Sequence, residues 1–204
     1  MNEERIILAS GSAIRRQILD GAGLNYDVVV RPVDEAAIKD SMLAENSRLR
    51  DIADALAEAK AMRVSRQQAG LVIGADQIMV MADETGKDQL FDKPKDMEEV
   101  RTRLLSMRGK KHELVGAVVI CENGVPVWRH LSRTKLWVRE FSESFLDWYI
   151  ETEGEALMKS VGAYRFEGPG SQLFEKVEGD FFAILGLDLL PVLQYLRTRG
   201  MALT

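Results

Sequence analysis

The chain contains one cysteine and two histidines among its 204 residues. A single cysteine cannot form an internal disulfide, and these side chains are too few for the tetrahedral set of nitrogen and sulfur ligands that a structural zinc site requires. Cys121 lies within the apolar run of residues 114–121, so we expect it to be a small core residue. The low cysteine content fits a reducing compartment.

Long hydrophobic runs are also absent from the sequence. The first apolar run, residues 6–9, follows Glu3, Glu4 and Arg5 and is too short to resemble a signal peptide. No stretch is long and apolar enough to span a membrane. We therefore expect a cytoplasmic protein without a membrane partner.

The chain has no excess of basic residues, since 27 Lys and Arg face 32 Asp and Glu, a formal net charge of −5. This balance argues against a basic face for nucleic acid, so no nucleic-acid partner is expected. An acidic protein can still bind a polyphosphate through a local group of cations and a divalent metal ion. The length and the 46% hydrophobic content predict one globular domain over residues 1–204, either compact or with two lobes around a central cleft.

The common nucleotide-binding fingerprints are missing as well. Gly86-Lys87 and Gly109-Lys110 are each followed by a residue other than Ser or Thr, which excludes a Walker A loop. Gly168-Pro-Gly170 lacks the third glycine of a dinucleotide-binding turn. Any phosphate site must therefore be built in another way.

The hydrophobic periodicity alternates between strands and helices along the chain. Strands are predicted over residues 6–9, 26–31, 71–75, 112–121, 125–138 and 171–177, and helices after residue 12 and over residues 47–68, 96–107, 142–151 and 189–199. Glu122-Asn-Gly124 is a hairpin turn signal. The pattern predicts an α/β fold, with a mixed twisted sheet flanked by helices and a long antiparallel hairpin.

The first strand ends in a turn rich in hydroxyl groups. Ser10-Gly-Ser12 leads directly into a helical pattern that carries Arg15 and Arg16. Free backbone N–H groups, the positive end of the helix dipole, two hydroxyls and a guanidinium together favour a phosphate. The alternative is that Ser10 or Ser12 only caps the helix and that the arginines are solvated.

Two further strand ends deliver carboxylates. Asp76 and Gln77 follow the buried run of residues 71–75, and Glu35 follows the second strand. A carboxylate at a buried strand end needs a cation or hydrogen-bond donors. Asp76 and Glu35 have the oxygen ligands that Mg²⁺ prefers, and Asp76 is also suited to orient or deprotonate a water. The alternatives are a turn residue for Asp76 and an exposed loop acid for Glu35.

Several short motifs occur in one order along the chain. They are Leu8-Ala-Ser-Gly-Ser-Ala-Ile-Arg-Arg16, Val33-Asp-Glu35, Leu56-Ala-Glu-Ala-Lys-Ala61, Ile73-Gly-Ala-Asp76, Asp92-Lys-Pro94 and Gly162-Ala-Tyr-Arg-Phe-Glu-Gly-Pro-Gly170. With this set the sequence resembles, over nearly its whole length, the Maf family of nucleoside triphosphate pyrophosphatases. The resemblance implies the α/β fold that this family shares with inosine triphosphatases.

The resemblance also implies an activity, namely hydrolysis of a nucleoside triphosphate between the α and β phosphates with the help of Mg²⁺ or Mn²⁺. By position, Asp76 becomes the general base and a metal ligand, and Glu35 a second metal ligand. The groups that would hold the substrate phosphates are Ser10, Arg15, Lys60 and Lys93, and Ser12 is a further substrate-binding residue. Without the resemblance, the two lysines would be read as solvated surface charges. A homodimer is expected by analogy.

Two positions bear on the substrate. Asp76-Gln77 and the Glu167 before Gly168 are similar to the branch of the family that cleaves 7-methyl-GTP. A carboxylate suits the N1–H and amino donors of a purine and the positive charge of a methylated base. The alternatives are the branch that cleaves dTTP and UTP, and a nucleotide-binding regulator of cell division without turnover.

The chain departs from the family pattern at four places. Ala13 stands where the family has proline, Ile14 where this branch often has tryptophan, Asp92 where glycine is usual and Asp188 where the family has Gly-Leu-Pro. Ile14 cannot stack on a cationic base as an aromatic ring can. Asp188 is expected to cap the helix that begins at Leu189.

Overall fold

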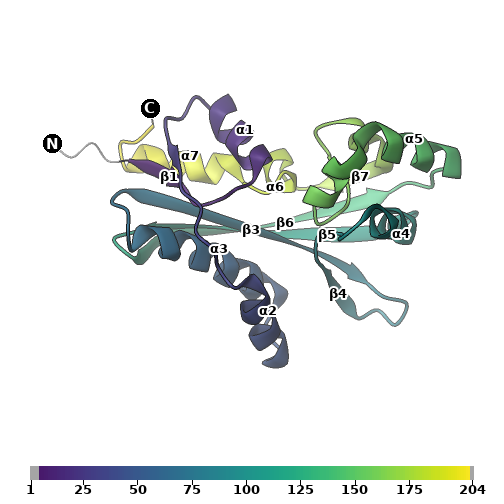
Figure 1. Cartoon of the computed structure of the whole chain (residues 1–204), viewed down its shortest axis with the longest axis horizontal. Coiled ribbons are helices and arrows are strands. Elements are labelled where there is room, and N and C mark those ends of the chain that lie inside the picture. The colour runs from purple at the N-terminus through teal and green to yellow at the C-terminus, as the bar shows by residue number, and fades with distance from the viewer. Residues whose placement is uncertain (1–4, 203–204) are drawn as a thin grey trace. The chain divides into compact units, whose positions relative to one another are not determined.

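A computed structural model describes residues 5–202 of the chain (Figure 1). The strands are β1 Ile6–Leu8, β2 Asp27–Val28, β3 Leu71–Ala82, β4 Asp88–Phe91, β5 Lys111–Glu122, β6 Val125–Val138 and β7 Phe174–Glu178. The α-helices are α1 Ala13–Gly21, α2 Glu35–Ala44, α3 Leu49–Ser65, α4 Met97–Met107, α5 Glu143–Glu153, α6 Phe181–Ile184 and α7 Leu189–Thr198. Short 3₁₀ helices span Gly154–Lys159 and Pro169–Leu173.

The strands form one mixed sheet in the order β2-β1-β3-β5-β6-β7, with β4 attached to β3. β1 pairs in parallel with β2 and with β3, whereas β3 pairs with β4 and β6 pairs with β7 in antiparallel fashion. The predicted fold class, a mixed α/β sheet flanked by helices with a long hairpin, is confirmed.

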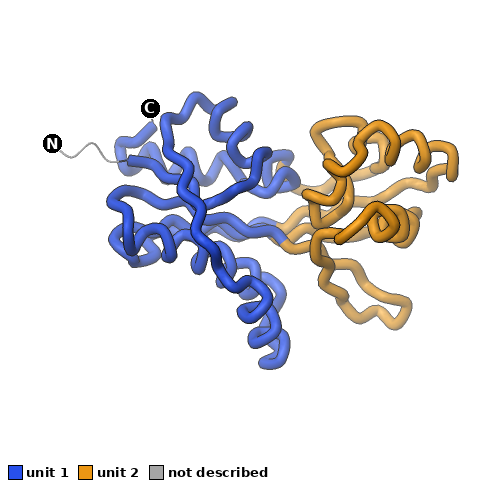
Figure 2. The backbone as a smooth tube through the Cα atoms, in the orientation of Figure 1, with its two compact units in different colours: residues 1–77, 116–132, 181–204 blue, residues 78–115, 133–180 orange. Residues whose placement is uncertain are grey.

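The chain divides into two compact units, which Figure 2 shows in blue and orange. Unit 1 comprises residues 1–77, 116–132 and 181–204, and unit 2 comprises residues 78–115 and 133–180. The long strands β3, β5 and β6 continue from one unit into the other.

In unit 1, alternate strand residues face two different helical layers. Leu8 on β1 and Ile73 and Ala75 on β3 share one core cluster with Leu19 of α1 and Val192 of α7. Gly74, which lies between Ile73 and Ala75 on β3, faces α3, the helix that precedes β3 in the chain. Figure 1 shows α1 and α7 on one side of these strands and α3 on the other. The period of two along a strand therefore decides which side chains can meet α3.

The predicted helix starts and the hairpin turn are confirmed by their local contacts. Ser12, Asp96 and Ser142 each accept a hydrogen bond at their side-chain oxygen from the backbone N–H three residues ahead. Asn123 and Gly124 adopt φ angles of 52° and 76°, the left-handed conformation that a two-residue hairpin turn requires. Cys121 is buried as predicted, and burial raises the pKa of its thiol to about 11.

The third predicted strand does not end before Asp76. β3 continues to Ala82 because its residues 79–82 pair with residues 88–91 of β4. Asp76 therefore lies within a strand, just beyond the point where the parallel pairing of β1 with β3 stops at Ile73. The alternative of Asp76 as a turn residue is wrong for the same reason.

Three other predicted boundaries also differ from the structure. β2 is only two residues long, because its partner β1 is itself short. Residues 171–173 belong to a 3₁₀ helix that begins at Pro169, so the last strand starts at Phe174. Helix α2, which begins directly after its N-cap Asp34, was not predicted. No helix within residues 5–202 has the length and apolarity needed to cross a membrane.

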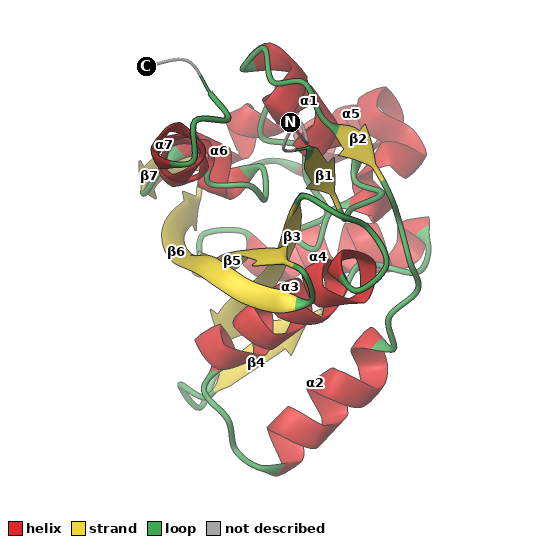
Figure 3. Cartoon of the chain, turned by 90° about the vertical axis from the view of Figure 1, so that its left-hand side faces the viewer, coloured by secondary structure: helices red, strands yellow, loops and turns green. Residues whose placement is uncertain are grey.

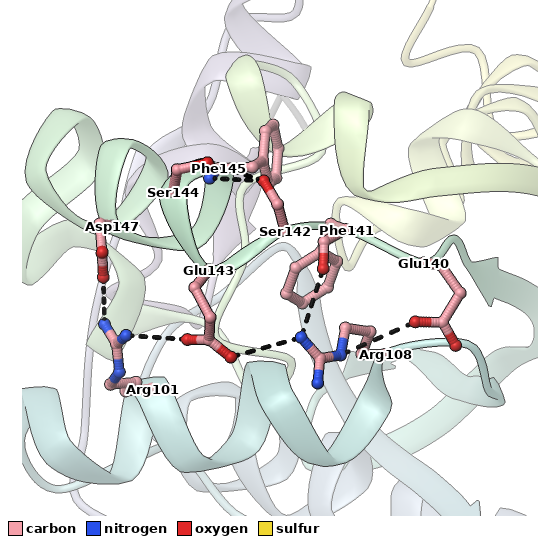
Figure 4. A network of polar contacts seen from close by, with 9 residues as sticks. All are labelled: Arg101, Arg108, Glu140, Phe141, Ser142, Glu143, Ser144, Phe145 and Asp147. Atoms are coloured by element: carbon pink, nitrogen blue, oxygen red, sulfur yellow. Dashed lines mark hydrogen bonds and ion pairs between the residues drawn. The ribbon is translucent and has the colours of Figure 1, made fainter.

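In unit 2, exposed ion pairs join α4 to the start of α5 (Figure 4). Arg101 of α4 contacts Asp147 at 2.6 Å and Glu143 at 3.1 Å, and Arg108 contacts Glu143 at 3.4 Å. Exposed pairs of this kind contribute little to stability, because water and salt screen their charges. They supplement the packing of the two helices rather than replace it.

Candidate active site

The turn between β1 and α1 is organised by the half-buried guanidinium of Arg15. Arg15 donates from Nε to the carbonyl of Gly186 at 2.8 Å, and from Nη1 to the carbonyl of Ala75 at 2.8 Å and to Ser10 Oγ at 3.1 Å. Ser10 is buried. Arg15 is therefore not the solvated charge of the alternative interpretation, whereas its neighbour Arg16 is exposed.

The two hydroxyls of the turn have different local tasks. Ser12 caps α1, since its Oγ accepts from the backbone N–H of Arg15 at 3.5 Å. Ser10 Oγ accepts from the N–H of Ser12 at 3.3 Å as well as from Arg15. The capping alternative thus holds for Ser12, and a phosphate contact by either hydroxyl stays a prediction.

Asp76 and Glu35 meet at one lysine. Lys60 Nζ lies 2.6 Å from Asp76 Oδ1 and 3.0 Å from Glu35 Oε1. Asp76 and Lys60 are largely buried, with 10% and 16% of their side chains exposed, whereas Glu35 is 45% exposed. Figure 3 shows α2, which begins with Glu35, beside α3, which carries Lys60.

A glycine allows Lys60 to approach Asp76. A Cβ at Gly74 would lie 2.3 Å from the carbonyl oxygen of Ala57 and 2.7 Å from the backbone nitrogen of Ala61. β3 and α3 are in close contact at this point, and only a residue without a side chain fits there. Gly74 and Asp76 share one face of the strand, so the same close approach brings Lys60 to Asp76.

Together these residues form a compact charged group in unit 1, which we term the Asp76 cluster: Ser10, Arg15, Glu35, Lys60 and Asp76. Burial lowers the pKa of the Arg15 guanidinium, while the charges of Asp76 and Glu35 act in the opposite direction. Within the cluster, the positive charges of Arg15 and Lys60 equal the negative charges of the two carboxylates. An anionic ligand therefore finds both cations already in place, with Glu35 as the more exposed of their partners.

The donor set of the cluster limits the kind of metal site it can form. Within residues 5–202 no group of three or more His, Cys, Asp and Glu side chains is arranged to hold a metal ion. Mg²⁺ is commonly bound by one or two carboxylates together with substrate phosphates and waters. Glu35 and Asp76 fit such a substrate-assisted site, and they do not form a site from protein ligands alone.

Gln77 lies on the opposite face of β3 from Asp76. Its side-chain amide donates to the carbonyls of Ala183 at 2.7 Å and Ile184 at 3.3 Å. These contacts attach β3 to the short helix α6 in unit 1. A role for Gln77 in substrate binding stays a prediction.

The remaining predicted site residues belong to unit 2. Lys93 lies between β4 and α4 beside the buried Pro94, and the carbonyl of the preceding Asp92 accepts a hydrogen bond from Arg103. Arg103 is itself buried and also donates to the carbonyl of Val161 at 2.7 Å. The segment that carries Lys93 is thus fixed by a buried guanidinium that sequence analysis did not identify.

Glu167 is paired with an arginine in unit 2. Arg165 Nε donates to Glu167 Oε1 at 3.1 Å, and Arg165 Nη1 donates to Glu153 Oε2 at 2.8 Å. We term these three residues the Arg165 cluster. Arg165 lies inside the motif that ends at Gly170, which is a signal in the sequence, but nothing in the sequence linked Glu153 to it.

Asp188 does not cap α7, contrary to the expectation. Its side chain makes no capping hydrogen bond, and Oδ2 lies 2.8 Å from His130 Nε2. His130 stacks on Trp128, which in turn stacks on Tyr195 of α7. The Asp188 carboxylate contacts the His130 imidazole on β6 instead of the backbone of α7. Asp188, which departs from the family pattern, therefore has a structural role in unit 1.

Comparison with known proteins agrees with the motifs. A family model described as "Maf-like protein" matches residues 5–199. The chain is 49% identical to a nucleoside triphosphate pyrophosphatase of Hyphomonas neptunium, over 95% of this chain and 96% of that protein. It is 50% identical to a protein of the same name from Caulobacter vibrioides, over 96% of each chain. It is 43% identical to a 7-methyl-GTP pyrophosphatase of Rhizobium meliloti, over 96% of each chain.

Proposed function

This chain belongs to the family of Maf-like proteins, and from that premise we propose that it is a nucleoside triphosphate pyrophosphatase whose substrate is 7-methyl-GTP. Water hydrolyses the bond between the α and β phosphates, and the products are the nucleoside monophosphate and pyrophosphate. The observation that carries the proposal is the Asp76 cluster, a buried carboxylate beside two cations at the end of the β1–β3 pairing.

Asp76 acts on the water in this proposal. Lys60 Nζ binds Oδ1 at 2.6 Å, which leaves Oδ2 to orient the water and to accept its proton. Lys60 also compensates the buried charge of Asp76 before substrate arrives.

Arg15, Lys60 and Ser10 bind the phosphates. Arg15 is held by two backbone carbonyls, so its guanidinium is oriented before the substrate arrives. Preorganised cations of this kind stabilise the charge that develops on the phosphates, and the removal of one such group typically costs ~10²–10³ in rate. Glu35 is the residue that a bound phosphate displaces from Lys60 most readily, because it is the more exposed carboxylate.

Glu35 and Asp76 would hold a divalent metal ion, Mg²⁺ or Mn²⁺, together with the substrate phosphates. When bound, such an ion neutralises phosphate charge and polarises the reacting phosphoryl group. Ser12, Gln77, Lys93 and Glu167 complete the proposed substrate-binding residues, and the assignment of the two in unit 2, Lys93 and Glu167, rests on the family motifs.

The choice of base rests on Glu167 and on the Rhizobium relative named for 7-methyl-GTP. A carboxylate accepts hydrogen bonds from a guanine edge and favours a cationic methylated ring. The two relatives named nucleoside triphosphate pyrophosphatase are more similar to this chain than the Rhizobium protein is. For this reason dTTP and UTP stay the alternative substrates.

The experiment is a measurement of pyrophosphate release, with Mg²⁺ and with Mn²⁺, from the common nucleoside triphosphates, dTTP and 7-methyl-GTP. We expect release from 7-methyl-GTP, dependent on the metal ion, and little from the others. EDTA in place of the metal serves as the control and should stop turnover.

Each other result has a definite meaning. Preferred release from dTTP and UTP would retain the reaction but overturn the assignment of 7-methyl-GTP. Nucleotide binding without release from any substrate would overturn the enzymatic proposal in favour of a nucleotide-binding regulator.

A further inference from the structure

The Arg165 cluster of unit 2 has an arrangement that local rules of protein structure disfavour. Glu153 is the last residue of α5, and only 5% of its side chain is exposed. A carboxylate at the carboxyl end of a helix opposes the helix dipole, and burial adds a desolvation cost. Arg165 supplies the compensating charge at 2.8 Å. Glu153 is unfavourable both for the helix dipole and for burial, and its charge is compensated by Arg165. Such a locally unfavourable residue indicates a specific role.

α5 holds Arg165 at two points. Tyr149 and Glu153 are four residues apart on this helix and therefore lie on the same face. The buried Tyr149 hydroxyl accepts from the backbone N–H of Arg165 at 3.1 Å, while Glu153 accepts from its guanidinium. Both the backbone and the side chain of Arg165 are thereby fixed to a rigid element.

The turn that follows Arg165 is equally constrained. The N–H of Gly168 donates to the carbonyl of Arg165 at 3.3 Å, and a Cβ at Gly170 would lie 2.3 Å from that carbonyl oxygen and 2.6 Å from the hydroxyl oxygen of Tyr149. Glu167 sits within this closed turn. Its position is thus determined by the contacts of Arg165.

Among the hydrogen bonds described for residues 5–202, Arg165 donates to only one of the two carboxylate oxygens of Glu167. Nε lies 3.1 Å from Oε1, and 23% of the Glu167 side chain remains exposed. Because the guanidinium is planar and its Nη1 is held by Glu153, its Nε–H points in a defined direction at Oε1, whereas a lysine ammonium with rotatable donors defines no such direction. Glu167 is therefore held in one orientation with acceptor capacity left for a ligand.

We propose that Glu153 and Arg165 are specificity-positioning residues: Glu153 orients the Arg165 guanidinium, and Arg165 holds the carboxylate of Glu167 in the direction that accepts hydrogen bonds from the guanine edge of the substrate. This inference rests on the proposed function, in which Glu167 selects the base. Neither positioning residue contacts the reacting phosphates in this scheme, so they act on the choice of substrate rather than on the chemical step.

The test uses Arg165→Lys, Glu153→Gln and Glu167→Gln in the full-length enzyme, singly and as the double variants Arg165→Lys/Glu167→Gln and Glu153→Gln/Glu167→Gln. The measured quantity is the ratio of kcat/KM for 7-methyl-GTP to kcat/KM for dTTP. Arg165→Lys keeps the charge that Glu153 needs, which protects the fold. Glu143→Gln, which breaks exposed ion pairs of the same unit (Figure 4), is the matched control.

We expect Arg165→Lys to lower the selectivity ratio by about tenfold, since coupled neighbours commonly interact at this level. The loss should appear in KM for 7-methyl-GTP, with kcat nearly unchanged. Glu153→Gln should act in the same direction but less strongly, because the amide oxygen still accepts from Arg165. Neither substitution should lower the ratio further once Glu167 is Gln. Glu143→Gln should leave the ratio unchanged.

A merely structural role would give a different pattern. If Arg165→Lys lowers kcat for all substrates equally, or if its effect persists in the Glu167→Gln background, the positioning role is wrong. If Glu167→Gln shifts the ratio and Arg165→Lys does not, the inference fails while the proposed function stands. If Glu167→Gln itself causes no shift, the proposed choice of base fails, and the inference fails with it.

Discussion

The Asp76 cluster of unit 1 and the Arg165 cluster of unit 2 share a charge pattern, in which a cation lies between two carboxylates. Lys60 joins Asp76 to Glu35, and Arg165 joins Glu153 to Glu167. In both clusters one carboxylate is the more buried of the two, Asp76 at 10% and Glu153 at 5% side-chain exposure, whereas the other is more accessible. The same charge pattern therefore recurs in two different structural settings.

The clusters differ in the kind of cation and in how it is held. Lys60 is a point charge with rotatable donors, so a phosphate is able to replace one carboxylate without a change in backbone geometry. Arg165 is a planar fork whose backbone is also fixed by Tyr149, so it defines a direction. In the roles proposed above, lysine suits a site at which a phosphate replaces a carboxylate, and arginine suits a site that orients a base-selecting carboxylate.

The largest effect is expected from Asp76→Asn, which tests whether the Asp76 cluster performs the chemical step. The amide keeps the shape of the side chain but cannot accept a proton, so we expect kcat to fall by about 10²–10⁴. Lys60 keeps Glu35 as a partner, and the variant should remain folded. Pyrophosphate release and the thermal unfolding midpoint are the measurements.

Asp188→Asn is the matched control, because Asp188 is another buried carboxylate of unit 1 outside the Asp76 cluster. It should retain most of the turnover. Normal activity of Asp76→Asn would remove Asp76 from the chemical step, whereas an equal loss in both variants would point to a general effect of buried charge in unit 1.

The next effect concerns Gly74, which permits the close approach that places Lys60 at Asp76. Gly74→Ala inserts a methyl group against the backbone of α3, and overpacking of this kind destabilises by about 1–3 kcal/mol. Because α3 must move away from β3, turnover should also fall. Chemical denaturation at fixed pH and steady-state kinetics measure the two effects separately.

Gly21→Ala is the matched control in unit 1, since a Cβ there meets no atom within 4 Å and its φ lies outside the left-handed region. It should be neutral or stabilise by about 0.4–1 kcal/mol, because alanine reduces the entropy of the unfolded chain. A Gly74→Ala variant that matches Gly21→Ala in both stability and activity would contradict the proposed spacing role.

The third effect concerns unit 2 and depends on pH. His112 is buried against Tyr164, whose hydroxyl lies 2.9 Å from Nε2, and Nδ1 has no hydrogen-bond partner within residues 5–202. Burial lowers the pKa of His112 from 6.5 to about 4. The neutral imidazole thus stabilises the fold fully above pH 6.5, and this contribution is lost as the pH falls from 6.5 toward 4, up to about 3 kcal/mol.

Urea unfolding of wild type and His112→Gln at pH 7.0 and at about pH 4.5 measures this contribution. Carboxylates titrate alike in both proteins, so the informative quantity is the difference between the two stability changes. His112→Gln should lose less stability on acidification than wild type. Identical losses would show that His112 does not destabilise unit 2 in acid.

Local interactions made several elements predictable. Ser12, Asp96 and Ser142 mark helix starts because their side chains satisfy backbone groups only three residues away. The Asn123-Gly124 turn follows from the φ angles that these residue types tolerate. The extension of β3 beyond Asp76 was missed because it depends on pairing with β4, which is a property of the sheet.

The residue types of the candidate site were predictable, but their partners were not. Asp76, Lys60 and Glu35 were each identified from motifs. The contact of both carboxylates with Lys60 Nζ, however, depends on the lack of a side chain at Gly74 and on helix α2, which was not predicted. Arg165 lies in a recognised motif, but its pairing with Glu153 joins that motif to the end of another helix. Asp188 was expected to cap α7 and instead contacts His130 on β6.

By itself, the sequence determined the α/β class, the family and the chemical groups available for a phosphate substrate, because these depend on periodicity, short-range capping and residue identity. Only the tertiary structure decided which carboxylate shares which cation. Lys60 meets Asp76 across 16 residues of sequence and Arg15 meets the carbonyl of Gly186 across 171 residues. Such contacts arise from the packing of helices against strands, which local sequence does not encode.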